Sequence, residues 1–185
     1  EPMVKIDGSP IAATILWTAL TLFFGGREQH KKGDGVYFYI PKTESARETK
    51  FYNNLFTEIK NSVPEIFNIN IKAIILIESL PAVFQMEEML FALGDYAAGL
   101  NAARWDLKAS ILEYVMHDKE FVWPDRFDVT IQNTEFMSNI FRRLVAVCLK
   151  HNAVPIGGMA TALPSKDEEV NIEAAKSIKA DKEWE

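Results

Sequence analysis

The sequence contains a single cysteine, Cys148, and its most apolar stretch, residues 11–24, is only 14 residues long. One cysteine cannot form an intrachain disulfide, so the sequence favours a reducing compartment. A membrane-spanning helix needs at least roughly 18 apolar residues, which this stretch does not supply. We therefore expect neither a disulfide framework nor a membrane partner.

Basic charge is also scarce, because 20 Lys and Arg face 26 Asp and Glu, which gives a formal net charge of −6. A nucleic-acid-binding domain usually carries a basic stripe, so we exclude nucleic acid as a partner. The chain has only three histidines, and their spacing does not suggest a shared metal site. We expect His30, His117 and His151 at the surface.

The overall composition is that of an ordinary globular protein, with 185 residues, 48% hydrophobic and 25% charged. This length can bury a core, but it is short for a complete eight-stranded barrel, which usually needs roughly 250 residues. Glu1 is not an initiator methionine, and the helical pattern that runs to Glu185 has no stop signal. We interpret residues 1–185 as one domain that is truncated at both ends.

Segments with strand and helix patterns alternate along the chain. Alternation of this kind favours an α/β fold with a parallel sheet, either open or closed into a barrel. The first helix is hydrophobic nearly all round, so we expect other parts of the protein to cover it, and Gly25-Gly26 to end it. The predicted strands are 36–40, 73–77, 97–106, 129–131 and 153–156, and the predicted helices are 11–24, 45–61, 81–93, 107–116, 135–151 and 168–182.

Two carboxylates follow neighbouring predicted strands. Glu78 comes directly after the run Ala73-Ile74-Ile75-Leu76-Ile77, and Asp106 ends the next stretch, 28 residues later, which is the size of a βαβ unit. Because the carboxyl ends of parallel strands lie side by side, Glu78 and Asp106 could face one cavity and bind magnesium. Each could equally cap a helix, since acidic residues are favoured at helix N-termini. The residues alone leave both interpretations open.

Other polar and glycine-rich positions follow predicted strand ends. Lys42 and Glu44 come after the strand at 36–40, so they could face the same rim or form a surface ion pair. Gly157-Gly158 follows the strand at 153–156 and could either cradle a phosphate or form a tight turn. A glycine pair alone does not decide between these two roles.

Two segments, 77–88 (IESLPAVFQMEE) and 99–106 (GLNAARWD), resemble the A-type form of malate synthase. Residues 37–44, 124–126, 157–160 and 180–183 match in the same order, so the resemblance covers nearly the whole chain. It implies a TIM (β/α)8 barrel, of which this chain covers most but not all, and a C-terminal helical domain that the chain lacks.

The resemblance also implies a site and a reaction. Glu78 and Asp106 match the residues that hold Mg²⁺, and Ala103, Arg104 and Trp105 match the segment whose backbone amides bind glyoxylate. Independently of the resemblance, the place of Lys42 and Glu44 after a strand end suggests that they could contact these site residues from the next layer. The implied reaction is that of an acyltransferase of the glyoxylate cycle, which condenses acetyl-CoA with glyoxylate and hydrolyses the product to malate and CoA.

Two catalytic residues of the family would lie outside the chain, an arginine before Glu1 and an aspartate base after Glu185. We therefore expect the fragment alone to be inactive and to act with the remainder of its parent polypeptide. In some animals that polypeptide is fused to isocitrate lyase. The family's compartments are the peroxisome or glyoxysome and the cytoplasm, with the mitochondrion as a further option, and this stretch carries no targeting signal.

The chain departs from the family pattern at two places. Ala102-Ala103 stands where the family has Cys-Gly, which narrows the permitted backbone, and Leu107-Lys108-Ala109-Ser110 stands for Tyr-Ile-Phe-Ser. Three alternative functions stay open, and the departures support the second of them. They are a malyl-CoA or citramalyl-CoA lyase, a non-catalytic barrel scaffold, and a magnesium aldolase that does not use CoA.

Overall fold

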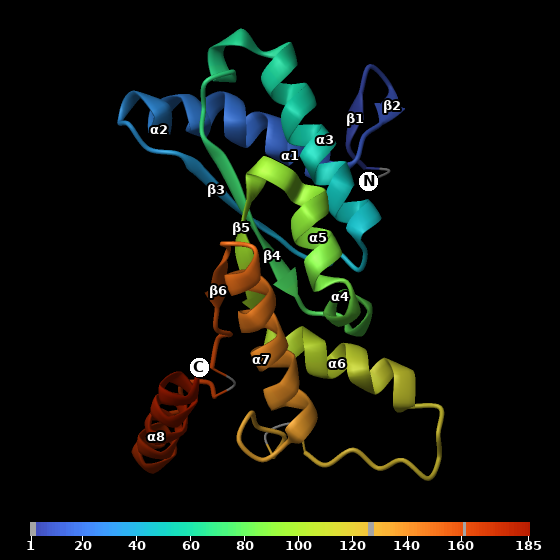
Figure 1. Ribbon diagram of the computed structural model, residues 1–185, viewed down its shortest axis with the longest axis vertical. Coiled ribbons are helices and arrows are strands. Elements are labelled where there is room, and N and C mark those ends of the chain that lie inside the picture. Colours follow the sequence, from blue (N-terminus) through green and yellow to red (C-terminus); the bar gives the residue numbers. More distant parts are fainter. Residues whose placement is uncertain (1–2, 126–127, 161) are drawn as a thin grey trace.

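The computed structural model describes residues 3–125, 128–160 and 162–185. Its centre is a parallel sheet in which four strands pair in sequence order, β3-β4-β5-β6 (Figure 1). The predicted parallel α/β arrangement is confirmed. Among the described residues this parallel sheet has four strands, where a complete barrel has eight. The strands are β3 (Val36–Ile40), β4 (Ile71–Ile77), β5 (Ala97–Ala102) and β6 (Val154–Ile156).

One face of the sheet is covered by the helices α3 (Ala46–Ser62), α5 (Met86–Leu93) and α7 (Glu135–Lys150) (Figure 1). Alternate residues of β4 are fully buried, as expected for a strand whose side chains point to opposite faces in turn. Ile75 and Ile77 are among the buried ones and belong to the main hydrophobic core. Burial of these residues toward the helices turns the intervening side chains of β4 toward the opposite face, where the candidate site lies.

The segment before β3 differs from its prediction. It forms one continuous helical stretch of α1 (Ala13–Leu20), a π-helical segment η1 (Thr21–Gly26) and α2 (Arg27–Lys31), preceded by a short hairpin of β1 (Lys5–Ile6) and β2 (Ser9–Pro10). The prediction that Gly25-Gly26 ends the helix is wrong. A Cβ on Gly26 would lie 3.1 Å from the Ile69 side chain, so this glycine allows the helix to pack closely against the segment before β4. The expected covering is also incomplete, because Trp17 and Phe24 are exposed.

The remaining connections hold two further differences. The helix predicted at 81–93 is two helices, α4 (Leu80–Phe84) and α5, which meet at the non-helical residue Gln85. Residues 129–131 form no strand, because Thr130 and Asn133 exchange backbone-to-side-chain hydrogen bonds in a turn. Val129 and Ile131 are buried there, which explains the misleading apolar pattern. The other elements are η2 (Pro64–Ile66), η3 (Gly94–Tyr96), α6 (Arg104–Val115) and α8 (Glu168–Trp184).

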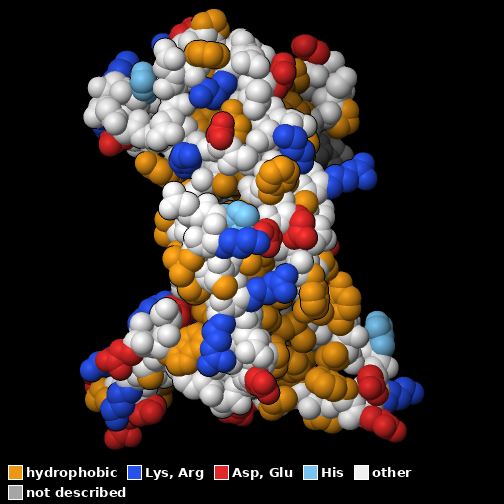
Figure 2. Space-filling view, in the orientation of Figure 1, with side chains coloured by type: hydrophobic (Ala, Val, Ile, Leu, Met, Phe, Trp, Pro, Cys, Tyr) orange, Lys and Arg blue, Asp and Glu red, His pale blue; other side chains and the backbone are white. Residues whose placement is uncertain are grey.

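Exposed hydrophobic side chains gather around α6 and the segment that follows it. Tyr114, Met116 and Val122 are each more than half exposed there, and Figure 2 shows hydrophobic side chains over this lower right part of the molecule.

Within the described ranges, no helix combines the length and the apolar character needed to cross a membrane.

Candidate functional site

The two predicted carboxylates lie at the carboxyl edge of the sheet. Glu78 directly follows β4, and its position in the alternation turns it away from the helix layer. Glu78 is buried, with 4% of its surface exposed. Asp106 is the third residue of α6, which starts two residues after β5 ends, so this carboxylate belongs to a helix rather than to the strand end that the sequence predicted. The βαβ spacing nevertheless brings both carboxylates together.

Lys42 bridges these carboxylates. Its ammonium nitrogen lies 2.8 Å from Oδ1 of Asp106 and 3.3 Å from Oε2 of Glu78. Its backbone N–H also donates a hydrogen bond to Oε1 of Glu78, at 2.5 Å. Lys42 follows β3 and has a φ of +57°, a left-handed conformation that is uncommon for a residue with a side chain. The two carboxylates therefore already share one cation.

The ion pairs shift the titration of their members. The hydrogen bond from Lys42 holds the pKa of the Asp106 carboxyl below its usual range, and the same contact raises the pKa of the Lys42 ammonium. The contribution of the Asp106 carboxylate to folding stability is therefore lost when the pH falls through its lowered pKa. The contribution of the Lys42 ammonium is lost when the pH rises through its raised pKa. Between these limits, a range that includes neutral pH, Lys42 and Asp106 stay ionised.

Replacing Lys42 with methionine should raise the pKa of Asp106 toward its ordinary value, because the change removes the hydrogen bond and the positive charge that favour the carboxylate. A carbon-13 NMR titration of the aspartate carboxyl groups measures this shift. Lys31→Met is a matched control, since it removes an exposed ion pair with Glu28 at another part of the chain. Identical Asp106 titrations in the two variants would contradict the assigned cause.

A cavity of about 400 Å³ opens beside the carboxylates. The predicted substrate-binding residues Ala103, Arg104 and Trp105 all line it, together with Glu78 and Asp106. Sequence reasoning missed four further residues of its lining, Tyr39, Leu76, Asn101 and Met159. The strand alternation could have found the first three, because Tyr39 and Asn101 share the open face of the sheet with Leu76, which pairs with Asn101.

The first turn of α6 faces this cavity with its backbone. Its N-cap residue, Ala103, provides no side-chain cap, and the first N–H groups of a helix have no partner inside the helix. Such a helix end attracts anions. Ala103 has a φ of −84°, so the alanine that replaces the family glycine fits this backbone without strain.

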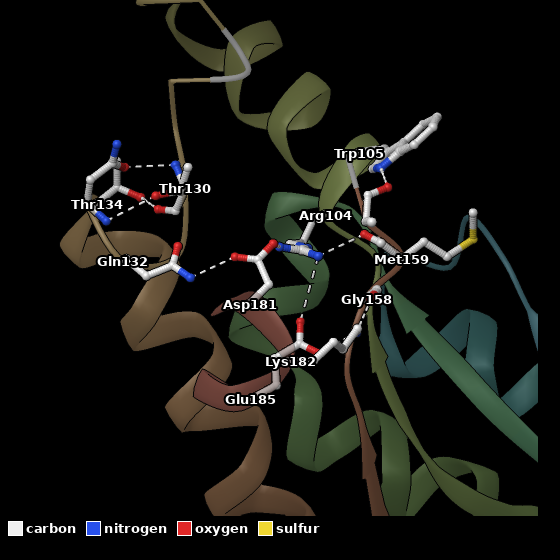
Figure 3. A network of polar contacts seen from close by, with 12 residues as sticks. Arg104, Trp105, Thr130, Gln132, Thr134, Gly158, Met159, Asp181, Lys182 and Glu185 are labelled. Carbon is white, nitrogen blue, oxygen red and sulfur yellow. Dashed lines mark hydrogen bonds and ion pairs between the residues drawn. The ribbon is translucent and has the colours of Figure 1, made fainter. Parts of the chain in front are cut away.

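The polar groups of the Arg104 and Trp105 side chains bind partners outside the cavity. The guanidinium of Arg104 contacts Asp181 and the backbone of Met159, and the indole N–H of Trp105 donates to the carbonyl of Ala160 at 3.0 Å (Figure 3). Any role of Arg104 toward a ligand in the cavity therefore falls to its backbone.

The structure does not bring Glu44 to the cavity. Its N–H donates to the Glu48 carboxylate, which also takes part in the capping box at the start of α3 with Ser45. Glu44 is exposed and belongs to this helix start. Lys42, by contrast, contacts both candidate ligands directly, which is closer than the supporting role that the sequence suggested.

Glu78 and Asp106 are the residues that could hold a metal ion here. Among the residues that the structure describes, no group of three or more His, Cys, Asp or Glu is arranged to bind a metal. A cation at this site would therefore take two protein carboxylates and complete its shell from water or a small ligand. Mg²⁺ suits such a site, because it usually binds through one or two carboxylates and keeps several waters.

A family model described as the TIM barrel domain of malate synthase matches residues 1–185. The chain belongs to the malate synthase family. It is 40% identical to malate synthase A from Escherichia coli (strain K12), across 100% of this chain and 34% of that protein. It is 42% identical to malate synthase from Streptomyces arenae, across 99% and 34%. The chain thus spans about a third of the length of the malate synthases that it matches.

A solved structure, a citrate lyase from Burkholderia xenovorans LB400, shares the fold of this malate synthase domain. The TM-score is 0.58 at 12% sequence identity, and the match covers 94% of this chain and 59% of that one. The predicted family and the predicted TIM-barrel class are confirmed. The prediction that residues 1–185 form a single domain truncated at both ends remains a prediction.

Proposed function

We propose that the polypeptide that carries this chain is a magnesium-dependent malate synthase. It would condense acetyl-CoA with glyoxylate and hydrolyse the resulting malyl-CoA to malate and CoA. The observation that carries this proposal is the convergence of Glu78 and Asp106 on one cation, beside an uncapped helix end, in a chain of the malate synthase family.

The carboxylate pair fits a small divalent cation. Both side chains offer hard oxygen atoms, and the buried Glu78 is already oriented by the N–H of Lys42. When bound, Mg²⁺ polarises the aldehyde of glyoxylate as a Lewis acid. The Lys42 side chain is 64% exposed, so its ammonium can swing into solvent when the metal enters. Lys42 then continues to orient Glu78 through its backbone.

The first turn of α6 supplies the complementary contacts. The free N–H groups of Arg104, Trp105 and Asp106 are suited to the glyoxylate carboxylate, because a helix N-terminus favours negative charge. Trp105 and Met159 line the same cavity. The chain's own residues thus bind and orient glyoxylate. The resemblance assigns removal of the acetyl-CoA methyl proton to a residue beyond Glu185.

The direct test is release of free CoA thiol from acetyl-CoA and glyoxylate by the full polypeptide that contains residues 1–185. We expect release that depends on Mg²⁺ and on both substrates. A parallel incubation with malyl-CoA or citramalyl-CoA in the absence of glyoxylate separates the lyase alternative. Cleavage of these thioesters to an acyl-CoA and an oxo acid, without thiol release in the first assay, would contradict malate synthase activity.

We place this activity in the peroxisome or glyoxysome, or in the cytoplasm. The placement in the glyoxysome is supported by relatives from Candida tropicalis and Glycine max, which are named glyoxysomal malate synthases. Fluorescence microscopy of the full polypeptide tagged at an internal surface loop, with a peroxisomal marker, distinguishes the two compartments. Mitochondrial fluorescence would contradict both.

A further inference from the structure

Arg104 joins three segments behind the candidate site. Arg104 is the first residue of α6 and is buried, with 3% of its surface exposed. One nitrogen lies 2.6 Å from Oδ2 of Asp181 in α8, and another donates to the carbonyl oxygen of Met159 at 2.9 Å. Figure 3 shows the guanidinium directed at Asp181 and away from the Trp105 ring. The start of α6 is thus tied both to α8 and to the segment after β6.

The partner carboxylate is itself held from two sides. Asp181 is also buried, and its second oxygen, Oδ1, accepts a hydrogen bond of 2.7 Å from the Gln132 side chain. Arg104 and Asp181 lie 77 residues apart in the chain, so the ion pair fixes a long-range contact. A guanidinium held by a carboxylate and a carbonyl has a defined orientation, which a flexible ammonium would lack.

The glycine turn after β6 fits tightly between these elements. A side chain on Gly158 would overlap the carbonyl oxygen of Ala102 and approach the Arg104 guanidinium, and one on Gly157 would overlap the Glu185 carboxylate. Lys182 donates to the carbonyl oxygen of Gly158 at 2.6 Å. Close packing is sufficient to account for this glycine pair.

We propose that Arg104 and Asp181 are positioning residues for the cation site. The inference rests on the proposed function. Asp106 lies only two residues after Arg104 in the same helical turn, and that turn has no side-chain cap. The buried Arg104–Asp181 ion pair is therefore an anchor of this turn, which helps to fix where Asp106 meets Glu78 and where the backbone N–H groups of the turn point. The side chains of Arg104 and Asp181 would act through this placement of the turn, and not through contact with glyoxylate.

The coupling must work in both directions, because binding linkage is reciprocal. If the ion pair places Asp106 for metal binding, then metal binding stabilises the ion pair and the end of α8. Mg²⁺ alone should therefore slow hydrogen exchange of the backbone amides near Asp181 in the wild-type protein. Asp106→Asn should remove this protection, although Asp106 itself lies in α6.

The test compares Mg²⁺ dissociation constants by titration calorimetry on the full polypeptide. We expect Arg104→Lys and Asp181→Asn each to raise the constant at least tenfold. In activity assays they should raise the KM for glyoxylate more than that for acetyl-CoA. Lys179→Ala is the matched control, since it removes an exposed pair with Glu183 on the same helix and should change the constant less than twofold.

Several outcomes would overturn the inference. An unchanged dissociation constant in a folded Asp181→Asn protein would mean that the ion pair only tethers α8. If Arg104→Lys does not fold, the Asp181→Asn variant and hydrogen exchange in the wild type still test the inference. Hydrogen exchange near Asp181 that does not change on addition of Mg²⁺ would contradict the coupling. Absence of Mg²⁺ binding by the wild type would instead contradict the proposed function itself.

Discussion

Glu78→Gln is expected to abolish most of the Mg²⁺-dependent release of CoA thiol. Glutamine keeps the size of the side chain but removes the negative charge, and Glu78 is one of only two carboxylates at the cation site of the described chain. Loss of a metal's Lewis-acid contribution costs several kcal/mol of transition-state stabilisation, which corresponds to a rate decrease of about 1000-fold. Thiol release with saturating acetyl-CoA and glyoxylate, over a range of Mg²⁺ concentrations, measures this effect.

The same experiment needs a glutamate whose loss should not matter. Glu87→Gln removes an exposed carboxylate that pairs with Lys150 and His151 on the outer helices, and it should retain nearly full activity. Circular dichroism shows whether each variant is folded. Full activity or undiminished Mg²⁺ affinity of a folded Glu78→Gln protein would show that Glu78 is not a metal ligand.

The sequence predicted the sheet and the meeting of the two carboxylates because both depend on local patterns. Continuous apolar runs identified β4, and the parallel arrangement followed from strands and helices that alternate. A spacing of one βαβ unit then placed Glu78 and Asp106 at one edge. Each step needs only residues that are near one another in the chain, so it did not depend on knowing any long-range contact.

Long-range partners were beyond this reasoning. Nothing in the segment around Arg104 indicates that its side chain meets Asp181, and the sequence predicted only that residues 168–182 form a helix. The bridging place of Lys42 depends on a left-handed backbone at a residue that is not glycine, which no simple pattern predicts. The turn at 129–131 looked like a strand because its apolar residues are buried for tertiary reasons.

Gly99→Ala should cause the largest loss of stability among single-methyl additions to the sheet. Gly99 pairs with Val154, and a Cβ at Gly99 would overlap the carbonyl oxygen of Val154 in β6. The backbone of a strand cannot move aside as a flexible side chain can, so β5 and β6 must separate locally. Overpacking of this kind costs about 1–3 kcal/mol, and β6 pairs through only three residues, so little holds it in place once displaced.

The displacement should also reach the candidate site, because β6 leads into the glycine turn. Asn101 donates to the carbonyl of Gly157 at 3.2 Å, and this contact depends on the correct pairing of β5 with β6. We therefore expect Gly99→Ala to lower the urea midpoint of unfolding and to weaken Mg²⁺ binding together. Gly25→Ala is the control, since a Cβ there meets no atom within 4 Å and alanine is favoured over glycine within a helix, so this variant should lower neither quantity. Equal midpoints for the two variants would show that β6 can shift without cost, and the pairing of Gly99 with Val154 would then not constrain the site.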